Sequence, residues 1–180
     1  MHIKSKLLRA QMFLLRPLAT QPGDFRTARR LQEESGKLMT RHEAAFTPVP
    51  LPHCEAELAE PPEAPPAHGV LLYLHGGGYT AGMLEYARGF GSTLAVRTGY
   101  PVLYPAYRLA PEDPYPAALD DAEDAYRHLL ESGYDAKQVV LAGESAGGGL
   151  CFALCLRLRG RGLPLPAGVV AVSPWADLTC

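Results

Sequence analysis

Several features that would place this chain in a functional class are scarce or absent from its sequence. No window approaches the ~18 consecutive apolar residues of a membrane span, and Arg9 and Gln11 interrupt the apolar N-terminus before it forms a signal-peptide core. Basic and acidic residues nearly balance, at 17 and 19, and no basic stripe interleaves with aromatic residues as nucleic-acid binding requires. We therefore expect a cytoplasmic protein with no membrane span and no nucleic-acid partner.

Cysteine is scarce as well, with only four residues, at positions 54, 151, 155 and 180. Their spacing forms no paired framework, and Cys151 and Cys155 lie one turn apart on a predicted helix. A structural zinc site needs four clustered ligands, so we interpret the cysteines as small buried apolar side chains. No metal site is expected.

The chain changes character along its length. At 180 residues and 47% hydrophobic composition, it is long enough for one substantial core. Residues 1–45 carry helical patterning and form an expected helical cap region, with residues 25–39 as its second helix. Residues 46–68 are Pro-rich and acidic, which suits one or two edge strands and an exposed connection. We assign residues 46–180 to a core domain.

From residue 69 onward, short apolar runs alternate with longer helical segments that end at glycine or arginine-glycine. Apolar runs predict four buried strands, at 69–75, 101–107, 138–143 and 168–174. The segments between them predict helices at 84–99, 117–132 and 145–160. This alternation predicts an α/β fold, with a mainly parallel sheet covered by helices on both faces.

A serine lies between glycines where the third of these strands meets its helix. The segment Gly143-Glu144-Ser145-Ala146-Gly147 has the G-x-S-x-G pattern of a nucleophile elbow, in the strand-turn-helix setting that the pattern requires. The turn is too tight for a Cβ at either flank and would hold the Ser145 hydroxyl above the carboxyl edge of the sheet. The other interpretation is an ordinary turn built from small residues.

A second glycine-rich turn, His75-Gly76-Gly77-Gly78, ends the first predicted apolar strand. Glycine lets the main chain approach a substrate closely, and the amides of Gly77 and Gly78 are candidate oxyanion donors together with that of Ala146. The helix N-terminus after Ser145 adds a partial positive charge for a developing oxyanion.

Four motifs in order give a resemblance to a known family. HGGGYTAG, YRLAPEDPYPAALDD, GESAGGGL and SPWADLT, within residues 69–179, resemble the hormone-sensitive-lipase-like branch of the α/β-hydrolase carboxylesterases. The resemblance implies an α/β-hydrolase fold with an eight-stranded sheet, a cap from the N-terminal helices, and hydrolysis of short-chain carboxylic esters through an acyl-enzyme. It implies a small-molecule ester substrate and no cofactor, and leaves a homodimer open for the intact protein.

The resemblance also suggests roles for individual residues. Ser145 matches the nucleophile, and three further residues match the oxyanion hole: Gly77, Gly78 and Ala146. His75 matches a residue that orders the glycine loop, although a strand-end histidine with no special role is the alternative. Glu144 matches a position that supports the elbow.

Other motif residues are expected to be structural. Tyr107, Arg108 and Glu112 match a motif that we interpret as an arginine–carboxylate pairing that fixes the Pro-rich loop. Tyr79 and Tyr86 are candidates to line an acyl pocket, with packing as the competing interpretation.

The general base is not evident. This fold places its partners in the chain order serine, then acid, then histidine, yet all six histidines precede Ser145. Asp177, the downstream carboxylate, falls in SPWADLT and is interpreted as structural. We expect the catalytic Asp and His beyond residue 180, with the C-terminal strands of the sheet missing. A cleavage or truncation product, one piece of a complex and a degenerate homologue are the three explanations.

Two other classes of function would also use a glycine-rich turn or a hydrolase scaffold. A dinucleotide-binding protein is disfavoured because neither glycine-rich turn fits G-x-G-x-x-G. An inactive fragment or a non-catalytic binding module on a hydrolase scaffold remains open because the base is missing.

Overall fold

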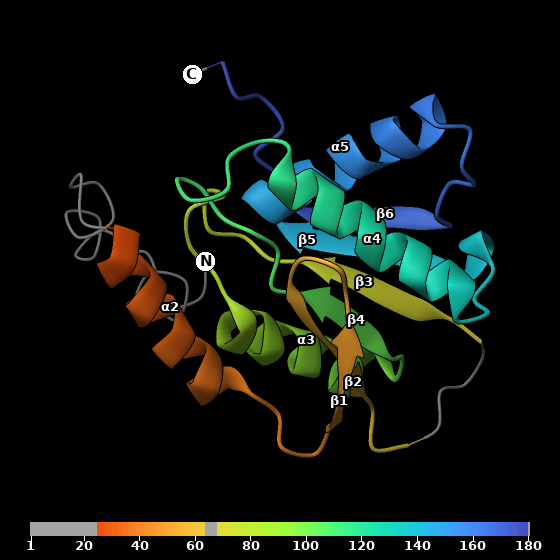
Figure 1. Ribbon diagram of the computed structural model, residues 1–180. Helices are drawn as coiled ribbons and strands as arrows, with labels where there is room; N and C mark the ends of the chain where they lie inside the picture. Colours follow the sequence, from red (N-terminus) through yellow and green to blue (C-terminus); the bar gives the residue numbers. More distant parts are fainter. Residues whose placement is uncertain (1–24, 64–67, 180) are drawn as a thin grey trace, which may run out of the picture.

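The structure, a computed structural model, describes residues 25–63 and 68–179 (Figure 1). Its elements are α2 (Phe25–Met39), β1 (Ala45–Pro50), β2 (Glu55–Glu60), β3 (Val70–Leu74), α3 (Leu84–Thr98), β4 (Val102–Pro105), α4 (Ala117–Glu131), the 3-10 turn η1 (Ala136–Gln138), β5 (Val139–Glu144), α5 (Ala146–Gly160) and β6 (Gly168–Val172). Among these residues, no helix is both long and apolar enough to cross a membrane.

The strands form one six-stranded sheet in the order β1-β2-β4-β3-β5-β6. Strands β4, β3, β5 and β6 run parallel, and Leu72 lies opposite both Leu103 and Leu141. The Pro-rich segment supplies an antiparallel hairpin, β1–β2, whose second strand joins β4. The prediction of a mainly parallel sheet with edge strands before residue 68 is therefore confirmed.

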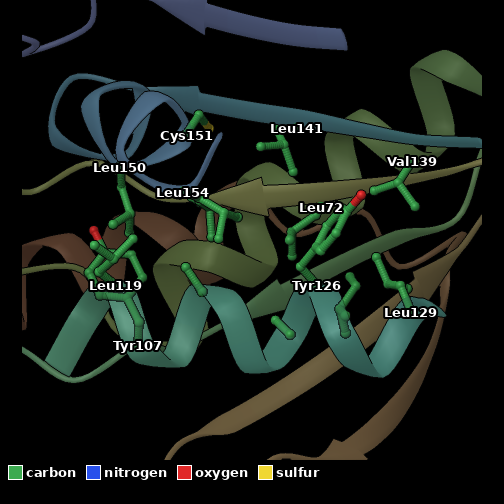
Figure 2. Packing of buried hydrophobic residues seen from close by; sticks show 14 of the residues in the cluster. Leu72, Tyr107, Leu119, Tyr126, Leu129, Val139, Leu141, Leu150, Cys151 and Leu154 are labelled. Carbon is green, nitrogen blue, oxygen red and sulfur yellow. The ribbon is translucent and has the colours of Figure 1, made fainter. Parts of the chain in front are cut away.

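Helices cover both faces of this sheet, as the apolar strands predicted. On one face, Leu72 and Leu141 pack against Tyr126 of α4 and Leu154 of α5, all fully buried (Figure 2). On the other face, the neighbouring strand residue Tyr73 packs with the α3 side of the core. Because strand side chains alternate between faces, both faces of each central strand are apolar. Burial of each large side chain contributes about 1.5–3 kcal/mol.

Helix α2 lies beside α3, outside the layer of strands (Figure 1). The two helices cross at Gly36, where a Cβ atom would lie 2.2 Å from the Glu85 carbonyl oxygen. Such a close crossing needs glycine. The helix predicted at residues 25–39 is present, whereas the first part of the predicted cap region, residues 1–24, lies outside the described residues.

Candidate active site

Ser145 occupies the turn between β5 and α5, where it was predicted. Its side chain is exposed, and its backbone has φ 53° and ψ −121°, a strained conformation for a residue with a Cβ. The Ser145 amide donates to the Val172 carbonyl at 3.0 Å, and its carbonyl accepts from Gly149 N at 3.1 Å and Trp175 N at 2.8 Å. Contacts with α5 and the end of β6 thus hold the strained turn.

The two flanking glycines are required by close backbone contacts. A Cβ on Gly143 would lie 2.6 Å from the Gly147 carbonyl carbon. A Cβ on Gly147 would lie 2.0 Å from the Leu74 carbonyl oxygen and 2.4 Å from that of His75. Any larger residue would therefore separate the elbow from the end of β3.

The second glycine-rich turn, residues 75–82, carries the candidate oxyanion donors and is called the oxyanion loop below. Gly77 has φ +128°, which residues with a Cβ rarely adopt, and its carbonyl accepts from the amides of Thr80 (3.1 Å) and Ala81 (3.0 Å). Within the described part of the chain, the amides of Gly77, Gly78 and Ala146 form no hydrogen bond. These three donors are available to a ligand.

Glu144 joins the oxyanion loop to the elbow. Its Oε1 accepts a 2.6 Å hydrogen bond from the Gly76 amide and a 3.3 Å bond from the Tyr86 hydroxyl. The Tyr73 hydroxyl also interacts electrostatically with this carboxylate, but it forms no hydrogen bond with it. Burial raises the pKa of Glu144, and the Gly76 bond opposes that rise. The prediction of proximity between the two turns is confirmed, while convergence of the three amides on one point stays a prediction.

His75 is fully buried beneath the oxyanion loop. Its ring stacks on Tyr107 at a centroid distance of 4.0 Å. His75 Nδ1 lies 2.9 Å from the Gly76 carbonyl, which can only accept, so the proton is on Nδ1. Burial lowers the pKa of His75 to about 4. The imidazole is therefore neutral at pH 7, and its contacts fit a residue that orders the loop.

The pairing expected within the Pro-rich loop is wrong in its partners. Arg108 binds Asp121 of α4, with Nη2 to Oδ1 at 2.8 Å, while Glu112 binds Arg29 of α2, with Nη2 to Oε2 at 2.7 Å. The motif was interpreted as an arginine–carboxylate pair that fixes the loop, but the structure pairs the two side chains with two different helices. Tyr107 does have a structural contact, a 2.6 Å bond from its hydroxyl to the His75 carbonyl.

An apolar cavity of ≈ 230 Å³ lies between the Pro-rich loop, α4 and the first turns of α5, with Tyr79 on its wall. The Tyr79 ring centroid is 6.2 Å from that of Trp175. Tyr86 instead contacts Glu144 and the edge of the His75 ring. The structure therefore separates the two tyrosines, with Tyr79 alone beside a cavity.

No base contacts Ser145 within the described residues, because its hydroxyl forms no hydrogen bond there. Asp177 has local contacts, accepting from Thr179 N at 3.0 Å and Oγ1 at 2.6 Å, which lower its pKa. His128 lies on α4 beside Ser132. Residues 25–63 and 68–179 also contain no cluster of three or more candidate metal ligands.

Comparison with known proteins agrees with this geometry. Residues 71–180 match the alpha/beta hydrolase fold family. A solved esterase from the bacterial hormone-sensitive lipase (HSL) family superposes with a TM-score of 0.85 and 39% identity, over 99% of this chain and 60% of that one. The chain belongs to the hormone-sensitive-lipase-like α/β-hydrolase family. The resemblance found from the four motifs is thus confirmed, together with the fold class.

Two further similar proteins give the scale of the match. An acetyl-hydrolase of Streptomyces hygroscopicus is 48% identical over 132 residues, which are 73% of this chain and 44% of the relative. EstE5, in a crystal soaked with p-nitrophenyl butyrate, has a TM-score of 0.85 and 36% identity over 95% of this chain and 58% of EstE5. The chain thus spans less than half of the acetyl-hydrolase and under two thirds of either solved esterase.

Proposed function

We propose that the protein is a serine carboxylesterase that hydrolyses short-chain esters through an acyl-enzyme. The observation that carries this proposal is the exposed Ser145 on a strained turn, beside a loop whose Gly77 and Gly78 amides are free. The names of the relatives, acetyl-hydrolase and esterase, support ester hydrolysis.

In the proposed reaction, Ser145 Oγ attacks the ester carbonyl carbon and loses its proton to a base. The carbonyl oxygen becomes an oxyanion, which accepts hydrogen bonds from Gly77, Gly78 and Ala146 amides and is stabilised by the N-terminus of α5. Collapse of the intermediate breaks the ester C–O bond, and the departing alkoxide takes the proton from the base. Water then attacks the acyl-enzyme by the same route and regenerates Ser145.

The base must be a group other than His75. A buried imidazole with a pKa of about 4 is a weak base at neutral pH, and its Nδ1 already binds the Gly76 carbonyl. We place the catalytic Asp and His outside residues 1–180, in the chain order that the family's fold uses.

The small volume of the cavity beside Tyr79 supports a preference for substrates with a short acyl chain. Its volume of ≈ 230 Å³ is below the roughly 300–1,000 Å³ of pockets for drug-sized ligands. The relative from Streptomyces hygroscopicus is called an acetyl-hydrolase, and EstE5 was soaked with a butyrate ester.

Steady-state hydrolysis of p-nitrophenyl acetate, butyrate and decanoate by the intact protein tests this proposal. We expect kcat/KM to be highest for the two short esters and to fall by several orders of magnitude in Ser145→Ala. Ser173→Ala, at another exposed serine, is the matched control and should retain activity. Absence of hydrolysis by the wild-type protein would favour a non-catalytic binding module on the same scaffold.

A further inference from the structure

One face of α2 contacts the oxyanion loop from outside the sheet. Arg29 Nε donates to the Thr80 carbonyl at 2.7 Å, and Nη2 donates to the Ala110 carbonyl at 2.9 Å. The same guanidinium pairs with both carboxylate oxygens of Glu112, at 2.9 and 2.7 Å. One arginine thus joins the oxyanion loop to the adjacent Pro-rich loop with a planar set of donors, a geometry that lysine cannot reproduce.

Glu33, four residues after Arg29 on α2, binds the segment that directly follows the oxyanion loop. Glu33 accepts from three amides at the start of α3: Met83 at 2.9 Å, Glu85 at 3.0 Å and Tyr86 at 3.2 Å. Helix α3 has no side-chain cap of its own, since its N-cap residue is Met83. Glu33 therefore satisfies amides that would otherwise lack acceptors, and it places the negative charge where the helix dipole favours it.

Gln32 lies between these two contacts in the sequence. Its Oε1 is buried without a hydrogen-bond partner among the described residues, and lies 3.2 Å from the position of a Cβ on Gly77. Arg29, Gln32 and Glu33 are three and four residues apart, so they share one face of the helix. That face contacts the loop from Gly77 to the start of α3.

The oxyanion loop needs such external support because of its own composition. Three consecutive glycines allow many backbone conformations, and ordering them costs more entropy than ordering other residues. Gly77, Gly78 and Tyr79 all have positive φ, at 128°, 64° and 60°. Oxyanion donors act only when they are held close to the position of the developing charge.

We propose that Arg29 and Glu33 of α2 are positioning residues for the oxyanion hole. They hold the second half of the loop, at Thr80 and through Met83 directly after it, in the conformation that presents the Gly77 and Gly78 amides to the acyl oxygen. The proposal rests on the proposed esterase function. It assigns α2 a part in transition-state stabilisation, beyond covering the site.

Kinetics of Arg29→Ala, Arg29→Lys and Glu33→Gln in the intact protein test the proposal. Since an oxyanion is present only in the transition state, kcat should fall about 10- to 100-fold in Arg29→Ala, Arg29→Lys and Glu33→Gln, with KM unchanged. Arg30→Ala is the control for arginine, because Arg30 is exposed on the same helix and forms no hydrogen bond or ion pair with the described residues. Glu34→Gln is the control for Glu33, since Lys37 is the only residue in the described part of the chain that pairs with Glu34.

Hydrogen exchange of residues 75–82 gives a readout that does not need ester hydrolysis. The Thr80 and Ala81 amides are bonded to the Gly77 carbonyl, and Arg29→Ala should raise their exchange rates by roughly tenfold or more, while Arg30→Ala leaves them unchanged. If Arg29→Ala does not fold, the same measurements on Arg29→Lys test the proposal. Wild-type exchange and wild-type kcat in folded Arg29 variants would overturn the proposal, as would a change in KM alone. A wild-type protein without esterase activity contradicts the proposed function instead, and the exchange result still decides whether α2 orders the loop.

Discussion

The Gly76 amide donates a 2.6 Å hydrogen bond to Glu144, the residue directly before Ser145. A single partly buried carboxylate therefore connects the oxyanion loop after β3 to the Ser145 turn after β5. The two glycine motifs, 68 residues apart in the chain, are held as one structural unit.

Removal of this carboxylate should weaken that unit. We expect Glu144→Ala to cost about 1–3 kcal/mol in the free energy of unfolding, because the buried Gly76 amide loses its acceptor. Glu144→Gln retains an acceptor oxygen and should cost less. Urea denaturation monitored by Trp175 fluorescence measures both, and equal losses for the two variants would contradict the assigned role of Glu144.

Substitution within the oxyanion loop should affect turnover more than stability of the sheet. In Gly77→Ala the new Cβ would meet the Ala81 carbonyl oxygen at 2.0 Å, so the loop must move and displace its donors. Loss of one donor costs about 10²- to 10³-fold in kcat. Gly160→Ala, at a helix position with open space around the Cβ, is the control. Unchanged kcat in a folded Gly77→Ala protein would refute the assignment.

Acid should destabilise the fold through His75. Its pKa is about 4 in the folded protein and about 6.5 in the unfolded chain, so the unfolded chain binds the extra proton between these values. The resulting loss in the free energy of unfolding is absent above pH 6.5 and grows as the pH falls. It is complete below pH 4, where it reaches roughly 3 kcal/mol.

Comparison of unfolding free energies at pH 7.5 and pH 4 isolates the His75 contribution. His75→Phe can still stack on Tyr107 but cannot titrate. The loss between the two pH values should be smaller in this variant by roughly 3 kcal/mol. Equal losses in the two proteins would exclude His75 as the source of acid sensitivity.

Residues 1–180 expressed alone should have almost no esterase activity. Removal of one triad member typically leaves turnover several orders of magnitude lower, and no described group contacts the Ser145 hydroxyl as a base. Hydrolysis of p-nitrophenyl butyrate by this chain, compared with the intact protein, is the measurement. Robust turnover by a 180-residue monomer would require another base, and His75→Phe and His128→Ala would then identify it.

Local sequence patterns were sufficient to predict the helices and strands, but not to predict the partners of the charged residues. The four apolar runs and three helices lie within a few residues of their predicted positions, because periodicity and glycine stops are properties of neighbouring residues. Asp121 is 13 residues from Arg108, and Arg29 is 83 from Glu112. Such pairs depend on how helices pack, which spacing along the chain does not encode.

The candidate site, too, could be predicted only in part. Ser145 and the oxyanion loop carry glycine signatures whose reason is backbone geometry, so the sequence predicted them. The contribution of α2 was missed because Arg29 and Glu33 belong to an ordinary amphipathic charge pattern. Only the folded structure, which places the first amides of α3 and the carbonyls of two loops beside α2, reveals what these side chains bind.

Reaction of the intact protein with a fluorophosphonate probe tests the central claim most directly, because phosphonylation requires an activated serine. Peptide mass spectrometry should locate one adduct on Ser145, and Ser145→Ala should abolish it. Absence of an adduct on Ser145 in a folded intact protein, or an adduct only at another residue, would contradict the account.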